Sequence, residues 1–172
     1  LPISPGRRCA TAPTMWWVRS ARQRAGRQAG HDGRTGRALV IRIGIDEVGR
    51  GPLAGPVLAA AVHLPEPIEG VTDSKKLTRA RREGLALLIR ERAIWALGAA
   101  SVAEIDRLNI LAASHLAMRR AFARLRSQVG GQRLEVLVDG HLDPQLGQEV
   151  RCIVRGDALI AEIGAASIIA KV

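Results

Sequence analysis

The sequence predicts an α/β fold in which helices pack on a mixed β-sheet. Residues 38–46, ALVIRIGID, bring isoleucine to every second position from Ile41 onward, a period of two that is typical of a strand. Apolar runs and helical patterns follow one another in the order strand, strand, helix, strand, helix, strand, strand, helix. The clearest helix begins at Asn109, where apolar side chains recur at steps of seven, four, three and four (Leu111, Met118, Phe122, Leu125 and Val129).

Short apolar runs and their boundaries define the first elements. Residues 55–64, GPVLAAAVHL, are bounded by Gly-Pro and by Pro, and predict a second strand that can form a hairpin with the first. Residues 66–76 are polar and predict a loop. Thr78 can then cap a helix that continues to about Arg92, with a buried stripe of three side chains (Leu85, Leu88 and Ile89).

Further apolar runs surround the long helix. Residues 93–102, AIWALGAASV, predict a third strand, and Gly130-Gly131 ends the helix. No internal repeat or coiled-coil heptad is visible. The remaining elements are two strands and a helix of small residues (LEVLVDG at 134–140, VRCIV at 150–154 and LIAEIGAASIIAKV at 159–172).

Positive charge is concentrated at the start of the chain. The 172 residues carry a formal charge of +10, and residues 1–40 hold eight arginines against one acid, Asp32. This segment lacks apolar periodicity and cannot bury enough surface to offset its chain entropy. We therefore predict a disordered basic extension at residues 1–38 and a folded domain at residues 39–172. The charge favours polyanionic partners such as nucleic acid, although a GC-rich genome would also enrich arginine.

Composition argues against two other classes of protein. Cys9 and Cys152 have neither metal-site spacing nor the density of a disulfide scaffold, which suits a reducing compartment. The longest nearly apolar run, residues 52–65, contains three prolines and a histidine and is shorter than the ~20 residues of a membrane helix. We expect a soluble, cytoplasmic, monomeric protein that binds no membrane.

Four acids lie where apolar strands are expected to end. Asp46 and Glu47 close the first strand, Asp139 ends VLVDG, and Asp157 follows the fifth strand. If these strands are neighbours, the carboxylates would raise one another's pKa unless a cation neutralised them. Oxygen donors without His or Cys favour Mg²⁺ or Mn²⁺ over zinc, and such pockets support two-metal phosphoryl chemistry. The alternative is that each acid is a solvated loop residue.

Two loops contain groups that suit phosphates. Gly49-Arg50-Gly51 places a cation on a backbone that can approach a ligand closely, because glycine has no Cβ. Read alone, this segment is a plain turn. The second loop would offer several donors and one acid to a phosphate (Asp73, Ser74, Lys75 and Lys76). Read alone, it is a solvated loop.

Five motifs stand in order along the chain: GIDEVGRGPLAGPV, TDSKKL, EIDRLNILAASHLAMRRA, VLVDG and VRGDALIAEIGAASIIAKV. Together they resemble the ribonuclease HII family over about residues 40–172. The resemblance implies an RNase H-like fold and an endonuclease that cuts the RNA strand of RNA–DNA hybrids. It also implies cleavage at single ribonucleotides embedded in duplex DNA, products with 5′-phosphate and 3′-OH ends, and a place in DNA replication and repair.

The resemblance assigns the metal ligands and catalytic acids. Asp46 would be the central ligand shared by two Mn²⁺ or Mg²⁺ ions. The family's four metal-binding acids match four positions of this sequence (Asp46, Glu47, Asp139 and Asp157).

The substrate-binding residues also follow from the resemblance. The family's Gly-Arg-Gly motif recognises the 2′-OH of the ribonucleotide and the neighbouring phosphate, and it matches Gly49, Arg50 and Gly51. The DSKK loop, with Ser74, Lys75 and Lys76, would hold the strand backbone.

The sequence departs from the family pattern in several places. Thr72 and His141 stand where the family has asparagine, so backbone contacts there are expected to differ. The family continues beyond AKV with an Arg-Asp pair, further helices and a tyrosine that stacks on the junction sugar, whereas this sequence contains no tyrosine. We therefore expect a catalytic domain that is incomplete at its C-terminus, a poor nuclease and marginally stable.

Two other functions compete with hybrid cleavage. A fragment of the same fold could bind hybrids without cutting them. Alternatively, the chain could be a basic nucleic-acid-binding module that acts through residues 1–40. Metal-dependent cleavage of a duplex with one ribonucleotide would distinguish hybrid cleavage from both of these alternatives.

Overall fold

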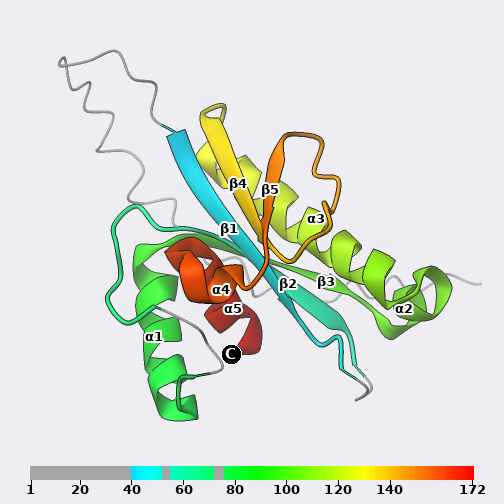
Figure 1. Ribbon diagram of the computed structural model, residues 1–172, viewed down its shortest axis with the longest axis horizontal. Helices are drawn as coiled ribbons and strands as arrows, with labels where there is room; N and C mark the ends of the chain where they lie inside the picture. The colour runs from blue at the N-terminus through cyan, green and yellow to red at the C-terminus, as the bar shows by residue number, and fades with distance from the viewer. Residues whose placement is uncertain (1–39, 52–54, 72–75) are drawn as a thin grey trace, which may run out of the picture. The chain divides into compact units, whose positions relative to one another are not determined.

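The computed structural model describes residues 40–51, 55–71 and 76–172, which belong to one compact unit. Its centre is a five-stranded sheet in the order β3-β2-β1-β4-β5 (Figure 1). The strands are β1 (Val40–Val48), β2 (Val57–His63), β3 (Ile94–Ala100), β4 (Arg133–Asp139) and β5 (Val150–Ile153). The helices are α1 (Arg79–Arg92), α2 (Val102–Leu108), α3 (Ile110–Val129), α4 (Gly156–Leu159) and α5 (Ala161–Lys171).

The sheet is mixed, as the sequence predicts. β2 pairs with β1 and with β3 in antiparallel fashion, so the expected hairpin is present. β4 pairs with β1 in parallel, with Ile45 opposite Val138, and β5 extends the parallel half. β1 is therefore the central strand, and its carboxyl end lies beside the carboxyl end of β4.

Helix α3 covers one face of the sheet (Figure 1). Its apolar stripe packs against the isoleucines of β1, because the period of two directs Ile41, Ile43 and Ile45 to this side. A glycine at position 98 of β3 permits close approach, since a Cβ there would meet the backbone of α3 at Ala117. The buried residues that α3 contributes to this core include four large side chains (Met118, Phe122, Leu125 and Val129) and alanines between them.

Helix α5 covers the opposite face, and α1 packs beside it. The other side of β1 carries Gly44, and a Cβ at this position would collide with the backbone of Glu162 and Ile163 in α5. Glycine therefore lets α5 rest directly on the central strand. Ile163, Ile168 and Ile169 are fully or almost fully buried at this face.

The residues between β3 and α3 differ from the prediction. We expected the third strand to reach residue 102, but β3 ends at Ala100 and α2 follows. Ser101 and Glu104 form a capping box in which each side chain accepts a backbone N–H from the other residue. The two side chains accept backbone N–H groups at the start of α2, so the helix begins here and the strand ends. The apolar run is therefore divided between two elements.

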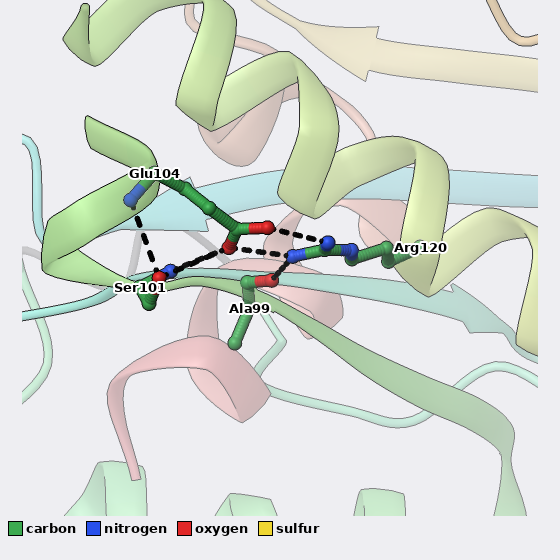
Figure 2. A network of polar contacts seen from close by, with 4 residues as sticks. All are labelled: Ala99, Ser101, Glu104 and Arg120. Carbon is green, nitrogen blue, oxygen red and sulfur yellow. Dashed lines mark hydrogen bonds and ion pairs between the residues drawn. The ribbon is translucent and has the colours of Figure 1, made fainter. Parts of the chain in front are cut away.

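Arg120 of α3 fixes this capping box in place (Figure 2). Its guanidinium makes two bonds to the Glu104 carboxylate, at 2.7 and 2.9 Å, and a third to the carbonyl of Ala99, at 2.7 Å. The bond from Arg120, followed by that from the Ser101 backbone, lowers the pKa of Glu104 to about 2. One side chain thus connects α3 with the end of β3 and the start of α2.

Two side chains of the predicted helical stripes are exposed. Leu88 of α1 points to solvent, because α1 contacts α5 through the narrower stripe of Leu85, Ala86 and Ile89. Leu111 lies in the first turn of α3 and is also exposed. Within the described residues, no helix is long and apolar enough to span a membrane. The predicted extension at residues 1–38 lies outside the described part of the chain.

Candidate active site

Asp46 is a buried acid at the carboxyl end of the central strand. It is 4% exposed and lies two residues after Gly44 in β1, so it is on the same face of the strand, which α5 covers. Its pKa is raised to about 7, mainly by burial and also by the charges of Glu47 and Asp139. A hydrogen bond with Ser167 and a 2.7 Å bond from its neighbour's backbone N–H to Oδ1 act in the opposite direction. Asp46 is therefore a carboxylate that a nearby cation would strongly stabilise in its ionised form.

Asp139 is positioned beside Asp46 by the strand register. Because Ile45 is opposite Val138 in the parallel pair, the next residue of each strand is one of these acids. Oδ1 of Asp139 accepts a hydrogen bond of 2.7 Å from the backbone N–H of Gly156. This bond connects the end of β4 to the short helix α4.

Asp157 follows Gly156 on α4 and is 5% exposed. A left-handed residue, Arg155 with φ of 56°, turns the chain from β5 into this helix. A Cβ at Gly156 would press on the Ile163 side chain and contact Asp139 Oδ1, so glycine allows α4 to approach β4. Asp157 is therefore buried on α4, the helix whose residue Gly156 already contacts Asp139.

Glu47 provides an oxygen without a partner. Its Oε1 accepts a hydrogen bond from Nη1 of Arg50 at 3.1 Å, which is also an ion pair. Its Oε2 is buried and has no hydrogen-bond partner among the described residues. A buried carboxylate oxygen in this condition is costly unless a further donor or a cation reaches it.

The donors fit a hard divalent cation by their chemistry. Carboxylate oxygens are the ligands that Mg²⁺ and Mn²⁺ prefer, and the unpartnered Oε2 of Glu47 is such a ligand. Within the described ranges, however, no three His, Cys, Asp or Glu side chains are grouped closely enough to hold an ion. An ion held by three of these side chains would therefore require at least one of them to move closer to the others.

The Gly-Arg-Gly segment lies next to these acids. Gly49 has φ of 95° and a Cβ there would meet the carbonyl oxygen of Pro56 at 2.8 Å, so only glycine suits this turn. Arg50 is exposed and turns back to Glu47. Gly51 is exposed and a Cβ would meet nothing within 4 Å, so packing does not account for its identity. The segment presents a cation next to Glu47 and open backbone at Gly51.

Part of the second predicted loop is outside the described residues. Ser74 and Lys75 fall in that part, together with Thr72 and Asp73. Lys76 is described and exposed, just before α1.

Sequence reasoning missed three polar residues near the acids. Ser167 is fully buried on α5, bonds with Asp46, and accepts a 2.6 Å bond from Nζ of Lys171. The signal was a serine four residues before a lysine in an otherwise apolar helix. His115 of α3 has its pKa lowered by burial and then by Arg119 and Arg50, while the charge of Glu47 acts to raise it. No spacing in the sequence indicated that His115 would lie close enough to Glu47 for the charge of this acid to affect its pKa.

Comparisons with known proteins first define the structural class. The chain resembles Bst-RNase HIII in complex with Mn²⁺ with a TM-score of 0.66 and 25% identity, covering 77% of this chain and 51% of that one. It resembles RNase HII in the PCNA:RNase HII complex from Archaeoglobus fulgidus with a TM-score of 0.60 and 28% identity, covering 76% and 71%. The fold is thus that of the ribonucleases H.

Sequence comparison then identifies the family. A model described as Ribonuclease HII matches residues 43–172, and the chain belongs to the ribonuclease HII family. It is 59% identical over 133 residues to Ribonuclease HII of Cereibacter sphaeroides (strain ATCC 17029 / ATH 2.4.9), covering 76% of this chain and 61% of that protein. It is 56% identical over 131 residues to that of Nitrosospira multiformis, covering 74% and 64%. The chain thus spans about three fifths of the length of these curated relatives.

Proposed function

We propose that this chain is an endonuclease that hydrolyses the RNA strand of RNA–DNA hybrids, including single ribonucleotides embedded in duplex DNA. The family and the ribonuclease H fold support this reaction class. The observation that carries it is that Asp46 and Asp139 lie side by side at the carboxyl ends of two parallel strands. The pKa of Asp46 is raised there to about 7, mainly by burial. Residues 39–172 would be the catalytic domain, acting as a monomer.

The four acids would hold two Mn²⁺ or Mg²⁺ ions. When bound, such ions supply the charge that stabilises the attacking and leaving oxygens in phosphodiester hydrolysis, which yields 5′-phosphate and 3′-OH ends. Asp46 would serve both ions because it is central in the sheet and flanked by Glu47 and Asp139. Asp157 would complete the set from α4, and the buried Oε2 of Glu47 would gain the partner it lacks.

The Gly-Arg-Gly segment would position the substrate. Arg50 is exposed at the rim of the acids, and its guanidinium can donate to a phosphate after releasing Glu47. Gly49 and Gly51 are exposed, and the open space at Gly51 would allow backbone N–H and C=O groups to approach the ribose 2′-OH, the group that distinguishes RNA from DNA. Ser74, Lys75 and Lys76 would contact the strand backbone as phosphate ligands.

Cleavage of a defined duplex tests the proposal. The full 172-residue chain is incubated with a DNA duplex that carries one ribonucleotide, with Mn²⁺, with Mg²⁺ and with a chelator, and the product ends are identified. The expected result is metal-dependent cutting on the 5′ side of the ribonucleotide and no cutting of the all-DNA duplex. Binding of the duplex without cleavage under any metal would support a hybrid-binding fragment instead. Cutting of the all-DNA duplex at a similar rate would contradict the assigned role of the 2′-OH.

A further inference from the structure

A chain of hydrogen bonds leads from the end of α5 to the central acid. Nζ of Lys171 donates to Oγ of Ser167 at 2.6 Å, and Ser167 hydrogen bonds with Asp46. Ser167 is fully buried, whereas Lys171 is half-buried in the last turn of the helix. These contacts therefore connect the last turn of α5 with the buried Asp46 carboxylate.

The donors and acceptors give this chain a single direction. An ammonium group has three hydrogens and no acceptor, so Lys171 can only donate to the serine oxygen. The Ser167 hydroxyl has one hydrogen, and the ionised Asp46 carboxylate can only accept. With Lys171 bound to the oxygen of Ser167, the hydroxyl hydrogen points to Asp46. The lysine thus sets the orientation of the serine.

Asp46 is then held by donors from two elements. The backbone N–H of Glu47 reaches its Oδ1 from β1 at 2.7 Å, and the Ser167 hydroxyl reaches the carboxylate from α5. Both neighbouring acids, Glu47 and Asp139, act on Asp46 with like charge. Two fixed donors oppose the rotation that such repulsion favours, and ligand positions must be held within about 0.5 Å for efficient metal chemistry.

We propose that Lys171 and Ser167 are positioning residues that hold the Asp46 carboxylate in the orientation needed for metal binding. The proposal rests on the proposed function for its kinetic consequences, but the fixed carboxylate is a property of the metal-free protein. A lysine in the last turn also interacts favourably with the helix dipole. That role alone would stabilise α5 without affecting Asp46, so experiments on Asp46 separate the two.

The first experiment observes the carboxylate without any metal or substrate. In the full chain, the amide proton of Glu47 is recorded by NMR, because this N–H donates directly to Asp46 Oδ1. Ser167→Ala and Lys171→Met are each expected to shift this resonance. Ser114→Ala is the matched control, since Ser114 is equally buried in a helix but donates to the carbonyl of Ile110. An unchanged Glu47 resonance in both test variants would overturn the proposal whether or not the protein is a nuclease.

The second experiment measures metal binding and turnover. Residues that orient metal ligands typically contribute ~10- to 100-fold to affinity or activity, so Ser167→Ala and Lys171→Met should each weaken Mn²⁺ binding in calorimetry by roughly 10-fold. They should lower kcat by a similar factor and change the KM for the ribonucleotide duplex little. Lys171→Arg, which keeps the donor and the charge, should recover most of the loss.

The double variant tests whether the two residues act as one unit. If Lys171 acts through Ser167, Ser167→Ala with Lys171→Met should resemble Ser167→Ala alone. Additive losses would show that Lys171 acts independently, which contradicts the proposal. A lower melting temperature with unchanged Mn²⁺ affinity in every variant would assign the residues a structural role instead. Absence of cleavage by the unsubstituted chain would contradict the proposed function, while the Glu47 resonance would still decide this inference.

Discussion

The backbone N–H of Gly156 donates a 2.7 Å hydrogen bond to the carboxylate of Asp139. This bond joins two segments 17 positions apart, and α4, which carries Asp157, contacts β4. The Asp139 carboxylate is thereby connected to the backbone that precedes Asp157, and the Asp157 side chain takes no part in this bond. The approach of α4 to β4 consequently determines where Asp157 lies relative to Asp139.

Gly156→Ala should disturb this connection. The added Cβ would lie 2.6 Å from Cδ1 of Ile163 and 3.4 Å from Oδ1 of Asp139. Because Cδ1 is the flexible end of a side chain, part of the clash can be relieved, and we expect a loss of ~1 to 2 kcal/mol in the free energy of unfolding. Denaturant titration measures it.

Gly84→Ala is the control for this change. Gly84 lies within α1 and a Cβ there would meet nothing within 4 Å, so alanine should stabilise the protein by up to ~1 kcal/mol. Equal effects of the two substitutions would show that α4 does not approach β4 as closely as described.

Arg50→Ala should affect the substrate more than the metal. Losing a charge-assisted hydrogen bond to phosphate costs ~1.5 to 3 kcal/mol, so we expect KM for the ribonucleotide duplex to rise by roughly 10-fold or more with a smaller change in kcat. Mn²⁺ affinity in calorimetry should change little, because Arg50 bonds to Oε1 of Glu47 and leaves Oε2 for an ion. Arg79→Ala removes an exposed ion pair with Glu83, and it serves as the matched control. A loss confined to metal affinity would contradict the substrate role.

Glu104→Gln should weaken the contact between α2 and α3. The substitution removes the charge that Arg120 binds through two bonds and leaves the shape nearly unchanged. The folded-state pKa of Glu104 is about 2, below its usual value near 4.5, so its contribution to stability is present above pH 4.5 and is lost as the pH falls towards 2. The melting temperature of the variant should therefore be lower at pH 6 and converge with that of the original chain near pH 2. A constant difference across this range would contradict the lowered pKa.

The fold was more accessible from the sequence than the details of the site. The strand that ends at Asp46 and the strand that ends at Asp139 are both visible as apolar runs, and parallel pairing then makes their acids neighbours. Helix α2 was missed although Ser101 and Glu104 have the spacing of a capping box, because the apolar run of β3 continues into it. Local patterns identify such elements only when their boundaries are read together with their interiors.

The bonds around the acids depend on tertiary packing. Ser167 reaches Asp46 because Gly44 lets α5 rest on β1, a contact between residues more than a hundred positions apart. The approach of α4 to Asp139 depends on the left-handed conformation of Arg155, which sequence preference disfavours for arginine. Neither relationship has a periodic signature, so both could be found only in the folded chain.

Asp46→Asn should change the pH dependence of stability as well as activity. The pKa of Asp46 is raised by burial to about 7 in the folded protein, from a usual value of 3.8. The folded state therefore binds more protons than the unfolded state between these values, and the metal-free protein loses stability as the pH rises from about 4 to 7. The limit of this contribution is roughly 4 kcal/mol, and it should be constant above about pH 8. Asparagine cannot ionise, so the variant should keep its stability over this interval while losing metal-dependent cleavage.

Chemical denaturation at a series of pH values, in a chelator, measures the difference, and Asp143→Asn, at an exposed acid, is the control. Added Mn²⁺ should stabilise the original chain above pH 7 by binding the ionised carboxylate, and the variant much less. The same decline with pH in both proteins would show that Asp46 is not the group responsible.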